Sequence, residues 1–340
     1  MTRILLFALA APLLLFGQDT GHITEPRTSK AKTLYVAADG TGDFSLIQPA
    51  IDVAPAEGAV INVAPGTYRE RLVINKPHIT LHGADVDPKR TVIINDQSAK
   101  TTGSTFKSAT VEARGNFFTA ENLTIANDWN ATHPQENQGS QALAVLATGD
   151  HGIFRNVRLL GNQDTLYAGT YGCKGNCPSP RQLYTHSYIE GNVDFIFGDA
   201  NAYFDHCEIH NTSHRAGGYV TAQGKAEAGK DSTFVFNHCK LTAEPDVKRV
   251  YLGRPWRPYA SVVFLNSEIG EHIEPVGWRE WHPGETNYLN TVFYAEYNST
   301  GPGAHPNERD PHVKKLTKEE AEEYEGKRFL SGADHWDPLR

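Results

Sequence analysis

The segments Phe204-Asp-His-Cys-Glu-Ile209 and Phe236-Asn-His-Cys-Lys-Leu241 follow one pattern. An apolar residue is followed two places on by Asn or His, then by a small or apolar residue, a polar residue and an aliphatic residue. Degenerate copies occupy residues 120–125, 154–159 and 264–269, so the Asn or His positions are 122, 156, 206, 238 and 266, at intervals of 34, 50, 32 and 28 residues. Units of this size cannot bury a hydrophobic face alone, so they must stack on one another.

The stacking is predicted to form a β-solenoid. From Val60 onward the chain consists of short β-rich runs that end at Gly, Asn, Asp or Pro. Variable intervals suit a solenoid, whose turns absorb insertions, and the right-handed parallel β-helix fits best. A sandwich or propeller would require hairpin turns such as Asn-Gly, which are scarce. We therefore predict an all-β, single-domain, right-handed parallel β-helix over residues 33–340, with short flanking helices at 45–54, where Ser45 is a plausible cap, and at 317–324.

Four cysteines leave several pairings open. Cys207 and Cys239 occupy the same repeat position, and stacked strands lie about 4.8 Å apart, so this pair could form a disulfide or remain two stacked thiols. Cys173 and Cys177 lie in a glycine-containing loop that could close locally. A zinc site at this first pair is disfavoured because no second ligand pair follows at finger spacing.

The first residues predict export. Residues 1–17 carry a single basic residue, Arg3, followed by an apolar run that is too short to span a membrane and has the layout of a secretory signal. A polar segment, 18–32, precedes the predicted domain. A net charge of −8 argues against nucleic acid or an anionic membrane as partner, and we expect a secreted (extracellular or periplasmic) monomer with no membrane contact after removal of the signal.

One carboxylate stands among apolar residues. Asp194 lies within residues 188–200, beside Val193 and close to Phe197, in a run that predicts a short buried strand. A buried carboxylate must be paired, hydrogen-bonded or neutral. The alternative is an aspartate that only caps a turn.

Three further segments place polar groups at strand ends. Gln141 begins a buried run, Gln163 and Asp164 are adjacent at another strand start, and Arg254 lies close to Trp256. Turn capping could explain each segment separately. Together with Asp194, however, they offer two carboxylates, two amides and one guanidinium. Arginine would keep one aspartate ionised as a nucleophile, the second would be pushed toward its protonated form as a general acid, and the amides could receive an oxyanion.

Eight segments then make the family resemblance specific. The chain closely resembles the pectin methylesterases over roughly residues 32–336, and the hallmark segments occur in the same order. The segments that carry the resemblance are 39–44, 66–70, 105–111, 141–146, 163–166, 191–198, 252–256 and 293–303. The resemblance implies a right-handed parallel β-helix that removes methyl groups from methyl-esterified polygalacturonate (pectin) and releases methanol, with no metal and no cofactor.

The resemblance also implies a role for individual residues. Asp194 matches the nucleophile, Asp164 the acid/base and Arg254 the group that orients the nucleophile. Residues 168–180 form a longer loop than the family pattern has, which affects the expected substrate length and not the chemistry. The remaining matches are Gln163 as oxyanion donor, Gln141 as a neighbouring amide, Trp256 and Thr105 as substrate contacts, and Val193, Phe197, Tyr167 and Trp278 as walls of the sugar groove.

Two other functions and a metal site fit the sequence less well. A polygalacturonase would need acids grouped around a water, without the paired glutamines. A non-catalytic pectin-binding solenoid would be expected to lack Asp164, Asp194 or Arg254. The histidines at 206, 210 and 214 recur every four residues, which could build a metal site on a helix but not on the predicted strand and turn.

Overall fold

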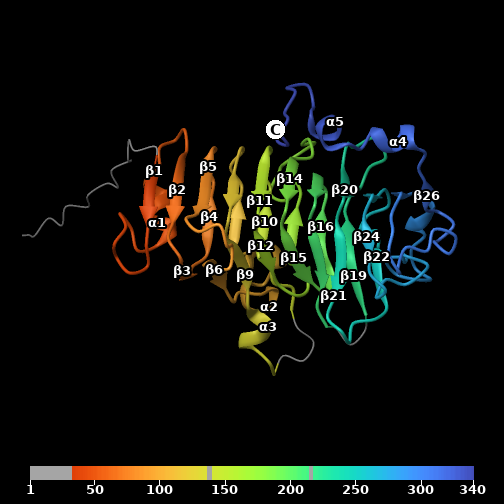
Figure 1. Cartoon of the computed structure of the whole chain (residues 1–340), viewed down its shortest axis with the longest axis horizontal. Helices are drawn as coiled ribbons and strands as arrows, with labels where there is room; N and C mark the ends of the chain where they lie inside the picture. Colours follow the sequence, from red (N-terminus) through yellow and green to blue (C-terminus); the bar gives the residue numbers. More distant parts are fainter. Residues whose placement is uncertain (1–32, 136–139, 214–216) are drawn as a thin grey trace, which may run out of the picture.

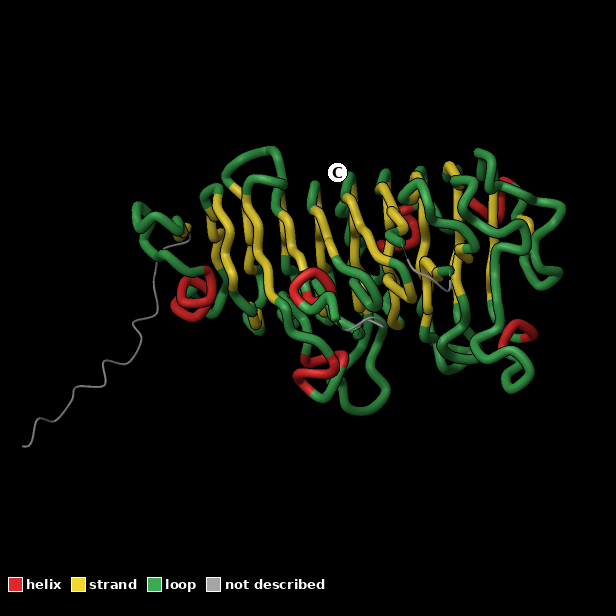
Figure 2. The backbone as a smooth tube through the Cα atoms, turned by 90° about the horizontal axis from the view of Figure 1, so that it is seen from below, coloured by secondary structure: helices red, strands yellow, loops and turns green. Residues whose placement is uncertain are grey.

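Three parallel sheets wind around one hydrophobic core, in a computed structural model that describes residues 33–135, 140–213 and 217–340 (Figure 1). All the strand pairings between neighbouring rungs are parallel, as in β17 (Asn201–Asp205) with β20 (Thr233–Asn237). Most rungs contribute one strand to each sheet, and the strands lie side by side along the long axis of the molecule, with the helices at its periphery (Figure 2). The predicted right-handed parallel β-helix is confirmed.

The three sheets are named A, B and C. Sheet A contains β1 (Thr33–Val36), β2 (Ala59–Val63), β5 (Ile79–Gly83), β8 (Thr119–Glu121), β11 (Gly152–Arg155), β14 (Arg181–Thr185), β17 (Asn201–Asp205), β20 (Thr233–Asn237), β23 (Ser261–Leu265), β25 (Phe293–Tyr297) and β26 (Lys314–Lys315). Sheet B contains β3 (Gly66–Arg69), β6 (Thr91–Asn95), β9 (Thr124–Asn127), β12 (Arg158–Leu160), β15 (Tyr188–Gly191), β18 (Glu208–Asn211), β21 (Lys240–Ala243) and β24 (Glu268–Ile269). Sheet C contains β4 (Leu72–Ile74), β7 (Val111–Ala113), β10 (Val145–Ala147), β13 (Leu166–Ala168), β16 (Val193–Gly198), β19 (Gly218–Gln223) and β22 (Val250–Gly253).

The helices are short and flank the sheets. None of them, within the described residues, has the length and apolar character that crossing a membrane requires. The α-helices are α1 (Ile47–Val53), α2 (Ala99–Thr102), α3 (Trp129–Thr132), α4 (Lys318–Glu322) and α5 (Gly326–Leu330), and the 3₁₀ helices are η1 (Thr105–Lys107) and η2 (Tyr288–Asn290).

The repeat pattern has a direct structural meaning. From Phe154 onward its first residue forms a continuous aromatic stack inside the solenoid, in which successive ring centroids lie 4.4 to 4.7 Å apart. Its Asn or His residue turns the chain from sheet A toward sheet B with a positive φ, a conformation that Asn, Asp and His adopt more readily than most residues. The stack consists of Phe154, Tyr184, Phe204, Phe236 and Phe264, and the turn residues, with φ from 47 to 55°, are Asn122, Asn156, His186, His206, His238, Asn266 and Asn298.

Two of these turns were not recognised in the sequence. His186 divides the interval of 50 residues into rungs of 30 and 20 residues, and Asn298 adds a rung after Asn266. Polar ladders join the column, since the Asn298 amide donates to Asn266 Oδ1 over 3.0 Å and His206 stacks between His186 and His238. The structure places His206 in the turn column, as predicted, whereas His214 lies outside the described residues.

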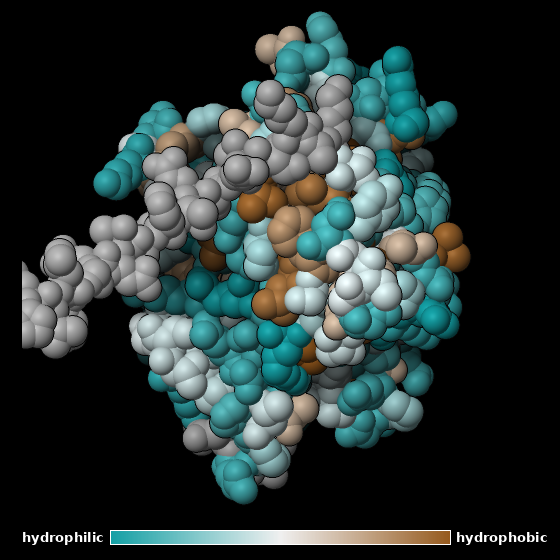
Figure 3. All heavy atoms as spheres, turned by 90° about the vertical axis from the view of Figure 1, so that its left-hand side faces the viewer, coloured by the Kyte–Doolittle hydropathy of each residue, from teal (hydrophilic) through white to brown (hydrophobic). Residues whose placement is uncertain are grey.

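The N-terminal end is covered by α1. Ser45 was predicted to cap this helix, but the cap is the Glu70 carboxylate, which accepts hydrogen bonds from the backbone N–H groups of Ile47 at 2.8 Å and Gln48 at 3.0 Å. The prediction of Ser45 is wrong because Glu70, which directly follows β3 (Gly66–Arg69), binds these donors instead. Hydrophobic residues gather in the centre of this end of the molecule and hydrophilic residues surround them (Figure 3).

The C-terminal segment packs on the outside of sheet A. Thr317 caps α4 in a reciprocal capping box with Glu320. Leu330 of α5 and its neighbours bury a second hydrophobic cluster that includes Leu183 and Tyr203. The predicted signal, 1–17, and polar segment, 18–32, lie outside the described residues.

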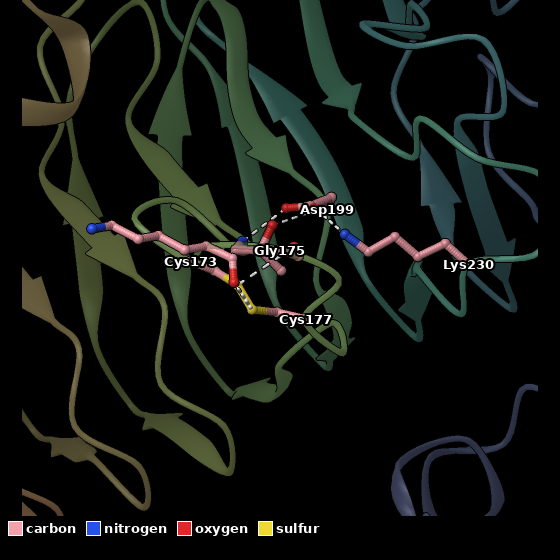
Figure 4. Close-up of a disulfide and its surroundings, with 7 residues drawn as sticks. Cys173, Gly175, Cys177, Asp199 and Lys230 are labelled. Carbon is pink, nitrogen blue, oxygen red and sulfur yellow. Dashed lines mark hydrogen bonds and ion pairs between the residues drawn. A yellow bond between two sulfur atoms is a disulfide. The ribbon is translucent and has the colours of Figure 1, made fainter.

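The cysteines separate into a bonded pair and a free pair. Cys173 and Cys177 form a disulfide that closes the loop between β13 and β14 (Figure 4). Asp199 holds the start of this loop, because its carboxylate accepts from Thr170 N at 2.8 Å and pairs with Lys230. Of the two alternatives for Cys207 and Cys239, the structure has two buried, free thiols.

Candidate active site

A cavity of about 370 Å³ opens on the outer side of sheet C. Its lining comes from successive rungs, because the register stacks corresponding positions of β10, β13, β16 and β19 in one column. Residues more than a hundred positions apart therefore share one site. The lining residues are Thr105, Phe106, Gln141, Gln163, Asp164, Asp194, Phe197, Ala222, Arg254, Trp256 and Trp281.

Asp194 is held by Arg254 in a bidentate ion pair. The guanidinium donates from Nε to Oδ1 over 2.9 Å and from Nη2 to Oδ2 over 2.6 Å. The Asp194 side chain is 7% exposed and that of Arg254 19%, so water screens the pair weakly. Planar, two-point binding fixes both the charge and the orientation of the carboxylate.

Both aspartates have a backbone conformation that few non-glycine residues adopt. Asp164 has φ of 64° and Asp194 of 51°, and the pairing of β16 with β19 shifts register just after Val193. The Asp164 N–H donates to the Val193 carbonyl over 3.1 Å, which ties the two rungs together. Strained residues of this kind cluster at functional sites, where the surrounding structure keeps them in place.

The two carboxyl groups differ in electrostatic environment. Burial and then the charge of Asp194 raise the pKa of Asp164 well above its usual range. Burial also raises the pKa of Asp194, but the hydrogen bonds and the charge of Arg254 oppose this shift. Within the described residues the Asp164 carboxyl has no cationic hydrogen-bond partner. Asp164 is therefore the group that retains a proton, and Asp194 is the group that ionises first.

Aromatic rings hold Arg254 from two sides. Its guanidinium carbon lies 4.1 Å from the ring centroid of Tyr219 and 4.3 Å from that of Trp281. Cation–π contacts of this kind stabilise a cation and limit its movement. They therefore position the partner of Asp194.

Gln141 and Gln163 supply uncommitted amides. Gln163 directly precedes Asp164, and its carbonyl accepts from the Ala142 N–H over 3.2 Å, which brings the two glutamine segments onto adjacent rungs. Neither side-chain amide bonds to another described residue, so their N–H groups are free to bind an oxygen that acquires negative charge. In the described part of the chain, no group of three His, Cys, Asp or Glu side chains is placed to hold a metal ion.

The hydrophobic walls were predicted only in part. Phe197 and Trp256 line the cavity, and the indole of Trp256 contacts Gly224, where an added Cβ atom would be 2.9 Å from its Cε3. Tyr167 is buried behind the wall, edge-on to Phe106 and Phe197. Val193 does not line the cavity and contributes its carbonyl to Asp164 instead.

Trp278 was predicted as a groove wall, and this prediction is wrong. Its side chain is 1% exposed, stacks on Tyr294 at a centroid distance of 3.8 Å and lies in the main core. Trp278 forms a parallel bridge with Gly253, which directs its ring inward. Three residues later, Trp281 emerges on the outside and reaches Arg254.

Sequence reasoning missed three lining residues, Phe106, Ala222 and Trp281. Phe106 directly follows Thr105 in a segment that was singled out, and Trp281 follows Trp278 in a segment with two tryptophans, so both could have been considered. Ala222 carries no chemical signal of its own. Its place is visible only from its register with Phe197.

Comparison with known proteins identifies related chains. Residues 33–333 match the family model described as Pectinesterase. A probable pectinesterase/pectinesterase inhibitor 23 from Arabidopsis thaliana is 35% identical over 89% of this chain and 53% of its own length, and the Arabidopsis pectinesterase QRT1 is 33% identical over 91% of this chain and 80% of its own. The chain spans about half the length of the first relatives that it matches.

Solved structures share the fold. Pectin methylesterase from carrot superposes with a TM-score of 0.79 at 31% identity, covering 88% of this chain and 93% of that one. Pectin methylesterase PemA from Erwinia chrysanthemi gives a TM-score of 0.74 at 28% identity, covering 91% and 99%. A pectin methylesterase in complex with a hexasaccharide gives 0.73 at 29% identity, covering 90% and 98%.

Proposed function

Because this chain belongs to the pectinesterase family, we propose that it hydrolyses the methyl esters of methyl-esterified polygalacturonate, releasing methanol and leaving free galacturonate carboxylates. The observation that carries the proposal is the bidentate pair of Arg254 and Asp194 beside the buried Asp164. One carboxylate is oriented to attack and the other is biased to hold a proton, and two free amides face the same cavity. This is the set of groups that acyl transfer requires.

The first half of the proposed reaction forms an acyl-enzyme. The Asp194 carboxylate attacks the ester carbonyl carbon, and the amides of Gln141 and Gln163 donate hydrogen bonds to the resulting oxyanion. The C–O bond to the methoxy group breaks as Asp164 gives its proton to the departing oxygen. Methanol leaves, and an anhydride joins Asp194 to the galacturonate carboxyl group.

The second half releases the product. Asp164, now ionised, takes a proton from a water molecule, whose oxygen attacks the galacturonyl carbon of the anhydride. The bond to Asp194 breaks, so the Asp194 carboxylate is restored and Asp164 is again protonated. Arg254 pairs with the Asp194 carboxylate before the attack and again after its release, which keeps Asp194 from competing for that proton.

Thr105, Trp256 and Phe197 are proposed to contact the sugar ring. All three line the cavity, and the flat faces of Trp256 and Phe197 suit the apolar faces of a pyranose. A related pectin methylesterase has been crystallised with a hexasaccharide, which supports an extended sugar chain as ligand. Trp281 and Tyr219 act through Arg254 and are proposed to be positioning residues.

An assay of two products tests the proposal. The purified chain is expected to release methanol from highly methyl-esterified pectin without creating new reducing ends, whereas a polygalacturonase would create reducing ends. Asp194→Asn, purified in parallel, is the control for a contaminating esterase. Absence of methanol from the wild-type chain, folded by circular dichroism, would reject the proposed activity, and binding without either product would indicate a non-catalytic pectin-binding solenoid.

Export through the segment 1–17 is also proposed. Its apolar run after Arg3 supports this, as does the disulfide between Cys173 and Cys177, because such bonds persist in oxidising compartments. N-terminal sequencing of the protein recovered outside the cytoplasm is expected to begin after Gly17. Recovery of the full-length chain inside the cell alone would contradict export.

A further inference from the structure

Asn127, at the end of β9, holds three other segments together. It is buried, and its amide nitrogen lies within hydrogen-bond distance of three backbone carbonyls, those of Gln97 at 2.8 Å, Leu143 at 3.0 Å and Ser108 at 3.2 Å. Its Oδ1 accepts from the Trp129 N–H over 3.1 Å. The two N–H groups of the amide are thus shared among three acceptors, and every polar atom of the side chain has a partner.

Ser108 holds one of these segments a second time. It is completely buried, and its Oγ accepts from the Leu143 N–H over 3.1 Å and donates to the Thr105 carbonyl over 2.6 Å. The Leu143 carbonyl accepts from the Thr110 N–H over 3.1 Å as well as from the Asn127 amide. Both backbone polar groups of Leu143 are therefore fixed.

The segment that is fixed in this way carries Gln141. This residue lies two positions before Leu143 and four before the start of β10, outside the regular pairing of sheet C. The Ala99 N–H donates to the Gln141 carbonyl over 2.8 Å, which ties the segment to α2. The Gln141 side chain lines the cavity without a hydrogen bond to another described residue, so its direction depends on the backbone that Ser108 and Asn127 hold.

Ser108 and Asn127 do not line the catalytic cavity themselves. A hydrogen-bond donor stabilises an oxyanion only from a well-defined place, and a displacement of about 1 Å can lower a rate by roughly a hundredfold. What the Gln141 amide contributes to the reaction therefore depends on two side chains outside the cavity.

We propose that Ser108 and Asn127 are positioning residues, which hold the Gln141 amide where the oxyanion forms. The inference rests on the proposed function and extends it to residues that do not line the cavity. Their hydrogen bonds also serve folding, because buried backbone groups need partners. The two roles differ in their effects, since a folding role changes stability alone, whereas a positioning role lowers kcat through Gln141 and leaves KM nearly unchanged.

A double-mutant cycle on methanol release from methyl-esterified pectin tests the inference. Ser108→Ala removes the acceptor of the Leu143 N–H, but the backbone N–H of residue 108 still donates to the Thr105 carbonyl over 3.0 Å. We expect kcat to fall about tenfold and KM to change less than about twofold. Gln141→Ala is expected to lower kcat about a hundredfold. Adding Ser108→Ala to Gln141→Ala should have no further effect on kcat, because the group that Ser108 positions is then absent.

Ser267→Ala is the matched control for Ser108→Ala. Ser267 is also completely buried, and its Oγ accepts from the Cys239 N–H over 3.1 Å and donates to the Leu265 carbonyl over 2.8 Å, but it does not line the cavity. The melting temperatures of the two serine variants should fall by similar amounts, whereas only Ser108→Ala should lower kcat. Asn127→Ala is expected to behave in the cycle as Ser108→Ala does.

The outcomes separate this inference from the proposed activity. The inference is overturned if Ser108→Ala or Asn127→Ala keeps the wild-type kcat, if either loss multiplies with that of Gln141→Ala, or if Ser267→Ala loses as much kcat. Ser108→Cys replaces a variant that does not fold, because a thiol is similar in size and accepts hydrogen bonds weakly, and the same outcomes then apply. Failure of the proposed function is a different result, namely absence of methanol from the folded wild-type chain.

Discussion

The two aspartates of the cavity lie in different electrostatic environments. Asp194 forms two hydrogen bonds to Arg254, whereas Asp164 is buried with no cationic hydrogen-bond partner among the described residues and feels the charge of Asp194. Arg254 therefore offsets part of the cost of ionising Asp194, whereas the folded structure favours the neutral acid at Asp164. We therefore expect substitution of either aspartate to lower activity, but the two substitutions to change stability in different directions.

Asp194→Asn and Asp164→Asn are both expected to lower methanol release by more than roughly a hundredfold, because each role needs a carboxyl group. Their stabilities should change in opposite directions. Burial raises the pKa of Asp164, so its contribution to stability is full below the unfolded pKa and is lost as pH rises. An amide at this position is neutral at every pH, so Asp164→Asn should melt higher than the wild type at pH 8 and by less at pH 4.

Asp194→Asn, by contrast, leaves the mostly buried Arg254 without its carboxylate and should cost about 1–3 kcal/mol of unfolding free energy at neutral pH. Thermal melts of both variants and the wild type between pH 4 and pH 8 check the two stability predictions. Equal melting shifts of the same sign would contradict the assigned environments.

The two tryptophans of the segment 278–281 offer a second matched pair. Trp278→Ala should destabilise the fold by about 3–5 kcal/mol, because it empties a buried site against Tyr294. Trp281→Ala should leave the melting temperature nearly unchanged and lower kcat/KM roughly tenfold through looser positioning of Arg254. Trp256→Ala is expected to resemble Trp281→Ala. Chemical denaturation measures the stability of each variant, and the kinetics of methanol release measure its kcat/KM. Unfolding of the Trp281→Ala variant would show that Trp281 belongs to the core.

At the level of the elements, a rung is specified by its turn. The Asn or His column needs a positive φ, and the aromatic position needs a ring that stacks on its neighbours. The segment with Tyr184 and His186 has both features. However, only 20 residues separate His186 from the next turn residue, His206. Short rungs are easily overlooked when copies are sought at intervals near 30 residues.

Thiol titration checks how the elements are cross-linked. The denatured, unreduced protein is expected to have two free thiols, Cys207 and Cys239, and the reduced protein four. Cys173→Ser with Cys177→Ser should cost at most about 2 kcal/mol, because the closed loop is very small. The same double variant should raise KM for polymer, since Tyr171 at the start of that loop supports Phe106. No free thiol, or four, before reduction would contradict the observed pairing.

At the level of the whole molecule, the C-terminal segment is tied to the middle of the solenoid. Asp334 accepts from Arg181 Nη1 over 2.6 Å and lies 2.7 Å from His151 Nε2, and Trp336 packs edge-on against His151. These residues are more than 150 positions apart in sequence. The segment thereby covers sheet A, whose outer hydrophobic cluster would otherwise face water.

Asp334→Asn is expected to loosen this attachment. The hydrogen bonds from Arg181 lower the pKa of Asp334, so the contribution of the contact is present above the unfolded pKa and is lost as pH falls. Limited proteolysis should cleave residues 326–340 several-fold faster in the variant at pH 7, with a smaller difference near pH 3. Asp337→Asn is the control, because Asp337 pairs with Lys327 and Arg340 inside the same segment. Equal cleavage of all three chains would show that the contact does not hold the segment.

The sequence alone determined the solenoid and indicated the proposed catalytic residues, because both depend on residue types at short range. Aromatic, Asn or His, and aliphatic positions repeat within six residues, and Asp164, Asp194 and Arg254 stand in segments whose composition is unusual for turns. Register and side-chain direction were decided only in the tertiary structure. Trp278 and Trp281 differ by three positions, yet one faces the core and the other Arg254, because a bridge to Gly253 sets the orientation of the chain. Likewise, Glu70 rather than Ser45 caps α1 because the chain brings the Glu70 carboxylate there directly after β3.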